Sequence, residues 1–395
     1  MRSVLLALCL AIPWSGSAAV VPYPAEVRVG VLGLLAPQRV EVTSVSELRS
    51  TSGHTFAAGR RVVIEVDRES LRFGGPSRNR WRGRSISVGA RGERISVVVH
   101  GRNVRRRLLP APVEFSLRGN RVVLVATFAL EDLVASAVAA ELAGVTETAA
   151  LEATAIAIRS YIATSRARHD DEGFDVCDST HCVHSAGLVE AGSGSDAAAV
   201  SAASMTRERV LARAGHVVTG YVTSCCGGET TTPSRTWGGK DLGDFVPVAC
   251  RVCSGRSTCS WERTVPATSI ASAIADAFGK PVPSDFTLRT RPDDGLAVRT
   301  VTIVAGAREW TVYRDAFRMA IGRRLGWDTL PSSNCEWTTE RRRYRFRGSG
   351  RGHGIGLCMM GAVELSIAGR TREEILLAYF PRAIIELLPR PSGGV

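Results

Sequence analysis

The residues best suited to chemistry lie between positions 130 and 182, and the first of them is a single acid. The run Leu130–Leu142 (LEDLVASAVAAEL) repeats apolar residues at helical spacing, and the next position on that apolar stripe is Glu141. A carboxyl group on the apolar face of a helix loses hydration, which raises its pKa. Such a group can act as a general acid near neutral pH. The alternative is a half-exposed acid at a helix end with no role, and the pattern alone leaves both interpretations open.

The second candidate is a cluster of metal-ligand residue types that follows shortly afterwards in the chain. It consists of His169, Cys177, His181 and Cys182. Thiolate and imidazole ligands together suit tetrahedral zinc. Four protein ligands would close the coordination shell, so the pattern predicts a structural ion and no metal-activated water. The alternative is a Cys177–Cys182 disulfide beside two uninvolved histidines, and His184 could substitute as a ligand.

A third candidate is the loop GSGRGHGIG, in which glycine occupies every second position from 348 to 356. It does not match G-x-G-x-x-G and no βαβ unit surrounds it, which argues against dinucleotide binding. Glycine at alternate positions lets the backbone approach a ligand closely, and His353 is the polar group at the centre. The alternative is a tight structural turn. Another glycine-containing turn, SCCGGETTT, begins at Ser224, where a predicted hairpin ends.

These residues need strands and helices to position them. From Tyr23 to about Val125, short runs such as RVVIEV and ISVVVH alternate apolar and polar residues between turn residues, which predicts a β-rich region. Helices are predicted at residues 130–142, 147–167, 269–278 and 314–325, from 196, and before about 378, with a final strand AIIELL. Mixed strands and helices without a βαβ rhythm predict an α+β fold. The predicted organisation is a signal peptide (1–19), a β-rich lobe (20–125) and the region with the candidate chemistry (126–390).

The net charge of the chain indicates which partners to expect, and its N-terminal residues indicate where the protein is located. A net charge of +12 most commonly reflects a solvated, arginine-rich surface. The alternative is an anionic polymer as partner, such as nucleic acid, a membrane surface or the cell wall. No zinc finger, RNP-like motif or aromatic-interleaved basic repeat is present, so nucleic acid is not the expected partner. Arg2, a short apolar core and small residues at Ser17 and Ala19 predict a secretory signal peptide. No other stretch is long and apolar enough to span a membrane, so we expect an exported, soluble mature protein in the periplasm, in the cell wall or outside the cell.

Cleavage near Ala19 would remove one of the ten cysteines and leave nine. Export permits disulfides. An odd number means that at least one cysteine lies outside an intramolecular bridge, or that some bind metal. A Cys226–Cys358 bridge could join the two glycine-containing loops. Another bridge could form among Cys250, Cys253 and Cys259, and the connectivity stays open.

Taken in order, five stretches resemble the stage II sporulation protein D family, which also includes amidase enhancers of bacterial cell walls. They are LEDLVASAVAAEL, LEATAIAIRSY, GFDVCDSTHC, YVTSCCGGET and GRGHGIGLCMMGA, within about residues 122–389. The resemblance implies that Glu141 is the catalytic glutamate, and the zinc cluster of some members falls on the His/Cys cluster described above. The family often has Gln where Thr154 and Met359 stand, and His where Thr223 stands. These departures affect expected substrate contacts and leave the acid in place.

The resemblance implies a lytic transglycosylase that cuts peptidoglycan between N-acetylmuramic acid and N-acetylglucosamine, especially in strands without stem peptides. Glu141 would act first as acid and then as base, giving a 1,6-anhydro end, with zinc in a structural role. The residues expected to hold the glycan are Arg159, Tyr161, Ser224 and His353. We expect Glu141, Ser224 and His353 to line one groove.

Two other functions stay open from the sequence. One is a non-catalytic protein that binds wall glycan and activates an N-acetylmuramoyl-L-alanine amidase, which would then be a partner. The other is a zinc hydrolase. The presence of an acid at position 141 argues against a purely non-catalytic enhancer.

Overall fold

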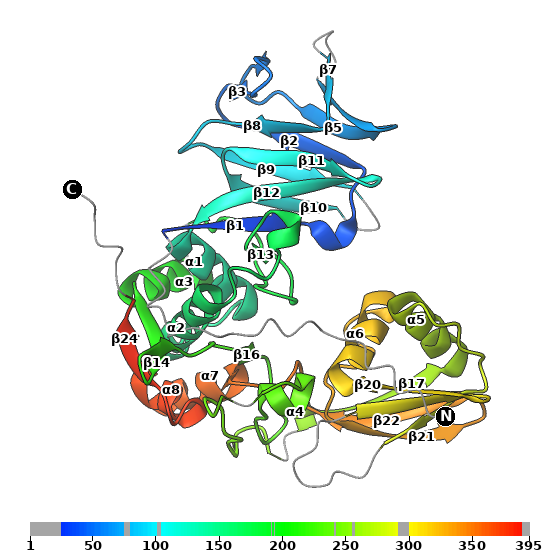
Figure 1. Cartoon of the computed structure of the whole chain (residues 1–395). Coiled ribbons are helices and arrows are strands. Elements are labelled where there is room, and N and C mark those ends of the chain that lie inside the picture. Colours follow the sequence, from blue (N-terminus) through cyan, green and yellow to red (C-terminus); the bar gives the residue numbers. More distant parts are fainter. Residues whose placement is uncertain are drawn as a thin grey trace. The chain divides into compact units, whose positions relative to one another are not determined.

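The computed structural model describes residues 25–74, 80–100, 104–190, 192, 194–240, 242–254, 257–290 and 300–388 (Figure 1). The predicted signal peptide lies outside the described residues. The described residues form two compact units. We call residues 25–212, 217–220 and 385–388 the N-terminal unit, and residues 213–216 and 221–384 the C-terminal unit.

The described residues contain eight α-helices together with strands gathered into several sheets, which confirms the predicted α+β class. The predicted helices at 130–142 and 314–325 are present as α1 (Leu130–Glu141) and α6 (Arg314–Leu325). In the described part of the chain, no helix combines the length and apolar character that crossing a bilayer requires.

The N-terminal unit begins with two sheets. One has the strand order β13-β1-β12-β11-β8 and the other the order β10-β9-β2-β5-β6-β7. Burial alternates along strands such as β9 and β11, because successive side chains of a strand point to opposite faces. The bounds are β1 (Glu26–Val31), β2 (Arg39–Thr43), β5 (Val62–Asp67), β6 (Ser70–Gly74), β7 (Arg80–Gly83), β8 (Ser85–Val88), β9 (Arg94–Val99), β10 (Arg105–Pro110), β11 (Val113–Arg118), β12 (Arg121–Ala129) and β13 (Val176–Cys177), with the short pair β3 (Leu48–Arg49) and β4 (Thr55–Phe56).

Three helices complete the N-terminal unit: α1, α2 (Thr148–Thr164) and α3 (Ser195–Met205), which Figure 1 shows grouped together. The second helix is buried along nearly its whole length, from Ala150 to Ala163. A helix that is apolar all round becomes a core element, and the small side chains of α2 suit close packing against its neighbours.

The compact units divide the chain at a different place from the boundary predicted after residue 125. Strand β12 crosses that position, pairs with both β1 and β11, and continues directly into α1. Strand β13, which comes after α2, returns to pair with β1. The β-rich region and the first three helices therefore share one unit, because strand pairs distant in sequence join them.

The C-terminal unit contains two three-stranded antiparallel sheets, with orders β17-β22-β21 and β18-β19-β20. Its core includes Ile270 and Ile274 of α5, Phe317 and Ile321 of α6, and Phe346 of β22. The bounds are β16 (Val222–Thr223), α4 (Pro233–Trp237), β17 (Ser260–Pro266), α5 (Ala267–Phe278), β18 (Thr287–Arg289), β19 (Thr300–Ala305), β20 (Arg308–Tyr313), β21 (Cys335–Glu340), β22 (Arg343–Ser349), β23 (Leu357–Cys358), α7 (Met359–Ile367) and α8 (Arg372–Tyr379). The strands β14 (Arg209–Arg213), β15 (His216–Val217) and β24 (Ile384–Leu387) contain three of the four described positions at which the chain passes between units, and the fourth follows Gly220.

Candidate active site and metal-binding clusters

Glu141 is the last residue of α1, at the end of a helix that is buried from Leu133 to Val138. Its side chain keeps 20% of its exposure. Burial raises the pKa of the Glu141 carboxyl to about 7. This agrees with the rise expected for an acid that continues an apolar stripe. A large fraction of Glu141 is therefore protonated at neutral pH and able to donate a proton.

His184 is the titratable group next to Glu141, with Nδ1 3.7 Å from Oε1 of the acid. That separation is too long for a direct hydrogen bond. Burial and the nearby positive charge of Arg107 lower the pKa of His184, so its imidazole is neutral at neutral pH. A neutral ring does not hold the Glu141 carboxyl in its ionised form. His184 was expected as a substitute metal ligand, and the structure places it beside the acid.

A serine on α1 fixes the loop that carries His184. The hydroxyl of Ser136 donates to the backbone carbonyl of Gly187 and lies 2.8 Å from the hydroxyl of Ser185. Gly187 has a φ of +96°, and a Cβ there would lie 2.5 Å from the carbonyl oxygen of Leu108 in β10. Only glycine allows this approach. The loop is thus held between α1 and β10, which keeps His184 beside Glu141.

The four predicted metal ligands come together in the N-terminal unit. Their ligand atoms all lie within 4.8 Å of one another. Sγ of Cys182 is 3.2 Å from Nε2 of His169 and 3.3 Å from Nδ1 of His181. The same Nδ1 atom of His181 is 3.8 Å from Sγ of Cys177. Zinc bonds of about 2.0–2.3 Å separate tetrahedral ligands by about 3.3–3.8 Å. Both thiols are free. The cluster could therefore hold one tetrahedral ion, and the alternative disulfide is not formed.

A second layer of contacts orients the His169 ring. Its Nδ1 lies 2.8 Å from Oε1 of Glu172, which leaves Nε2 facing Cys182. A carboxylate on the outer nitrogen is the usual partner of a metal-bound histidine, because it fixes the ring and raises its basicity. The ring of Phe174 stacks on the imidazole at a centroid distance of 4.7 Å. Glu172 was not identified from the sequence, although its position three residues after His169 is a signal that could have found it.

Asp178 and Arg107 lie beside the His/Cys cluster and were also missed. Oδ1 of Asp178 accepts a hydrogen bond from the backbone N–H of Leu32 at 3.0 Å, and Oδ2 is 3.7 Å from Nε of Arg107. Burial raises the pKa of Asp178 to about 6. Asp178 follows Cys177 directly, so these contacts attach the ligand-bearing loop to the sheets. No local sequence signal pairs a residue of β10 with this loop.

His353 and Ser224 belong to the C-terminal unit. Strands β16 and β23 pair in parallel there, and Thr223 links the two glycine-containing loops by donating to the carbonyl of Arg351 at 2.9 Å. His353 lines a pocket of about 170 Å³. The other polar residues that line it include Glu229, Arg314, Asp315 and Asn334. Burial lowers the pKa of His353 to about 4, so the ring is neutral. Ser224 is exposed and is not among the lining residues.

Comparison with known proteins bears on the N-terminal unit, where the candidate acid and the His/Cys cluster lie. Residues 118–212 match the model of the stage II sporulation protein family, SpoIID. The SpoIID segment runs from the end of β11 to β14 and contains Glu141 and all four residues of the His/Cys cluster. The match supports a function related to the bacterial cell wall. No curated protein is similar enough to the chain to count as a match.

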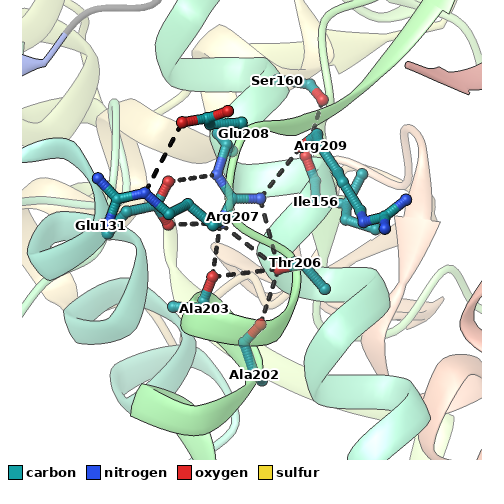
Figure 2. A network of polar contacts seen from close by, with 10 residues as sticks. Glu131, Ile156, Ser160, Ala202, Ala203, Thr206, Arg207, Glu208 and Arg209 are labelled. Carbon is teal, nitrogen blue, oxygen red and sulfur yellow. Dashed lines mark hydrogen bonds and ion pairs between the residues drawn. The ribbon is translucent and has the colours of Figure 1, made fainter. Parts of the chain in front are cut away.

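The SpoIID segment also contains Arg159, which was expected to hold the glycan. The position of its side chain argues against that role. Arg159 is 0% exposed, and its guanidinium pairs with Glu131 of α1 at 3.0 Å and 2.6 Å. It also donates to the backbone carbonyls of Ala203 and Arg209, at 3.0 Å each. Figure 2 shows Glu131, Ala203 and Arg209 in this network. A guanidinium used in this way joins the helices and is not available to a glycan.

The other expected glycan contacts are distributed as follows. Tyr161 is only 8% exposed and lies in the buried part of α2, so its ring is not presented to a polymer. Glu141 belongs to the N-terminal unit, whereas Ser224 and His353 belong to the C-terminal unit. The expectation that these three residues line one groove therefore stays a prediction.

Proposed function

We propose that the protein is a peptidoglycan lytic transglycosylase in which Glu141 is the single acid–base group. The observation that carries the proposal is the burial of the Glu141 carboxyl within the SpoIID segment, which raises its pKa to about 7. A general acid must hold its proton at the working pH and must have a pKa near that pH. An exposed glutamate, with a pKa of about 4.3, would be almost fully ionised at neutral pH.

The reaction needs one carboxyl and consumes no water. Glu141 donates its proton to the bridging oxygen as the bond from muramic acid C1 to that oxygen breaks. The carboxylate then stabilises the positive charge that develops at C1. The C6 hydroxyl of the same sugar attacks C1, and Glu141 accepts the hydroxyl proton. The products are a free N-acetylglucosamine hydroxyl and a 1,6-anhydro end, and Glu141 is again protonated. Two-carboxylate hydrolases differ because they add water.

We assign zinc a structural role at His169, Cys177, His181 and Cys182. When bound, it would cross-link the turn after α2 to the loop that leads to His184. Four protein ligands leave no open position, and catalytic zinc keeps one for water or substrate. This ligand set favours the transglycosylase over a zinc hydrolase.

The proposed substrate is the glycan strand of peptidoglycan, and the proposed location is the periplasm or cell wall. The net charge of +12 suits a partner that carries carboxylates or phosphates. The predicted signal peptide would deliver the chain to that compartment. An N-acetylmuramoyl-L-alanine amidase is the further partner expected, because removal of stem peptides would supply bare strands.

Glu141→Gln tests the proposal directly. Purified wild type and variant are incubated with peptide-free glycan strands, and the products are analysed by mass spectrometry. We expect 1,6-anhydro ends from the wild type and loss of about 10²–10⁴-fold in rate for the variant. Asp132→Asn is the matched control, since Asp132 is an exposed acid on the same helix. Undiminished cleavage by Glu141→Gln would contradict the proposal. Stimulation of an added amidase without any cleavage would favour the enhancer function.

A further inference from the structure

A second group of cysteines converges in the C-terminal unit. The sulfur atoms of Cys226, Cys250, Cys253 and Cys358 all lie within 4.8 Å of one another. Their exposed fractions are 4%, 4%, 1% and 0%. They come from three separate parts of the chain: the turn after β16, the loop before β17, and the end of β23. The sequence suggested a disulfide between Cys226 and Cys358 as one possibility. In the structure, Cys250 and Cys253 lie beside these two thiols.

The spacing of this four-cysteine cluster fits a single ion. Tetrahedral zinc with bonds of about 2.3 Å to sulfur separates its ligands by about 3.8 Å. Sγ of Cys253 lies 3.5 Å from Sγ of Cys358. Cys250 and Cys253 also have the C-x₂-C spacing that is typical of zinc-binding turns, and the N–H of Cys253 donates to the carbonyl of Cys250 at 3.1 Å.

A backbone N–H and a tyrosine hydroxyl approach the sulfur atoms. The backbone N–H of Cys226 donates to Sγ of Cys358 at 3.4 Å, and the hydroxyl of the buried Tyr379 is 3.3 Å from Sγ of Cys250. A Cβ on Gly361 would overlap the Tyr379 hydroxyl, so glycine is required for this approach. Donors of this kind stabilise thiolates, the form in which cysteine binds metal.

A neighbouring pair of thiols does not share this geometry. Cys225 and Cys259 lie close to Cys253, and their own sulfur atoms are 2.8 Å apart. Two thiolates on one zinc ion would be about 3.8 Å apart, so this pair does not fit the same tetrahedron. The ligand set is therefore limited to the four-cysteine cluster.

We propose that Cys226, Cys250, Cys253 and Cys358 bind a zinc ion, separate from the one proposed at the His/Cys cluster of the N-terminal unit. Soft thiolate ligands select zinc among the common divalent ions, and binding only releases protons, so no oxidant is needed. With four protein ligands the ion is structural. It would hold together the turn that follows Ser224, the loop 250–253 and the strand that leaves the His353 loop.

The test is the zinc content of the full-length protein, measured by mass spectrometry of the metal against protein concentration. Wild type should contain two zinc ions per chain, Cys250→Ser one, Cys177→Ser one, and the double variant none. Cys335→Ser is the matched control, because Cys335 belongs to the same unit and lies outside both clusters. It should retain two ions. Cys250→His restores a zinc ligand and should recover the second ion.

Two results would overturn the inference. One is a wild type with a single zinc ion that Cys177→Ser removes completely. The other is an unreduced denatured mass showing that the four cysteines are joined in disulfides. If Cys250→Ser does not fold, cobalt-substituted wild type decides, since a tetrathiolate site adds a sulfur-to-cobalt absorption beyond that of Cys177 and Cys182. None of these measurements depends on glycan cleavage, so failure of this inference can be distinguished from failure of the proposed activity.

Discussion

Oε1 of Glu141 lies 3.7 Å from Nδ1 of His184, and burial favours the neutral form of both groups. It raises the pKa of the carboxyl to about 7 and lowers that of the imidazole, with Arg107 adding to the second effect. Just below neutral pH the two side chains are thus neutral neighbours and not an ion pair. The proton stays on Glu141, where general-acid catalysis needs it.

The first prediction is the pH dependence of glycan cleavage. Since the reaction starts from protonated Glu141, kcat/KM should fall on the alkaline side with an apparent pKa of about 7. The rate of 1,6-anhydro product formation between pH 4 and 9 measures this limb. Asp132→Asn should give the same profile. A limb near the ordinary glutamate pKa of about 4.3 would show that the acting carboxyl is exposed.

The second prediction concerns stability. The Glu141 pKa is about 7 in the folded chain against 4.5 for the free side chain, so the folded state binds more protons between these values. The contribution of Glu141 to wild-type stability should therefore fall as pH rises from about 4.5 to 7, by about 3 kcal/mol at most. The Glu141→Gln variant lacks this titratable group, so its stability relative to wild type should increase as pH rises over this range. Thermal unfolding at pH 5 and pH 8 measures the difference, and an equal gap between the two proteins at both pH values would contradict the shift.

The third prediction addresses the His169–Glu172 contact. Glu172→Gln removes the carboxylate that orients the His169 ring and should weaken zinc binding about 10–100-fold. Competition with a chelator measures the affinity. Asp171→Asn is the control, because Asp171 is an exposed acid adjacent in sequence. Equal affinities for the two variants would mean that Glu172 does not support the metal site.

The parts of the site predictable from sequence are those encoded over short distances. The apolar periodicity of 130–142 predicted both α1 and the position of Glu141 at the end of its buried stripe. The His/Cys cluster was recognisable because its four ligands follow one another closely, between His169 and Cys182. Both features are determined by the spacing of residues close together in the chain, so a single sequence is enough to predict them.

Contacts between distant residues could not be predicted in this way. Arg159 was expected to hold the glycan, but it is buried, and its burial depends on Glu131 and on carbonyls that come 44 and 50 residues later. The four-cysteine cluster depends on Cys226 and Cys358, which are 132 residues apart. The odd cysteine count indicated that at least one cysteine lies outside an intramolecular bridge or that some bind metal, but only the fold shows which thiols meet.

The fourth prediction tests the structural role given to Arg159. Replacing it with Met removes the guanidinium that pairs with the Glu131 carboxylate, which is only 14% exposed. Removing one member of a buried pair destabilises by about 3–5 kcal/mol, because the remaining charge stays buried. Glu131→Gln should also destabilise, and the double variant Arg159→Met/Glu131→Gln should lose less than the sum of the two single changes. Thermal unfolding of all four proteins measures the coupling. Cleavage per folded molecule should stay near wild type in each, whereas a variant that folds normally but binds glycan poorly would return Arg159 to the substrate site.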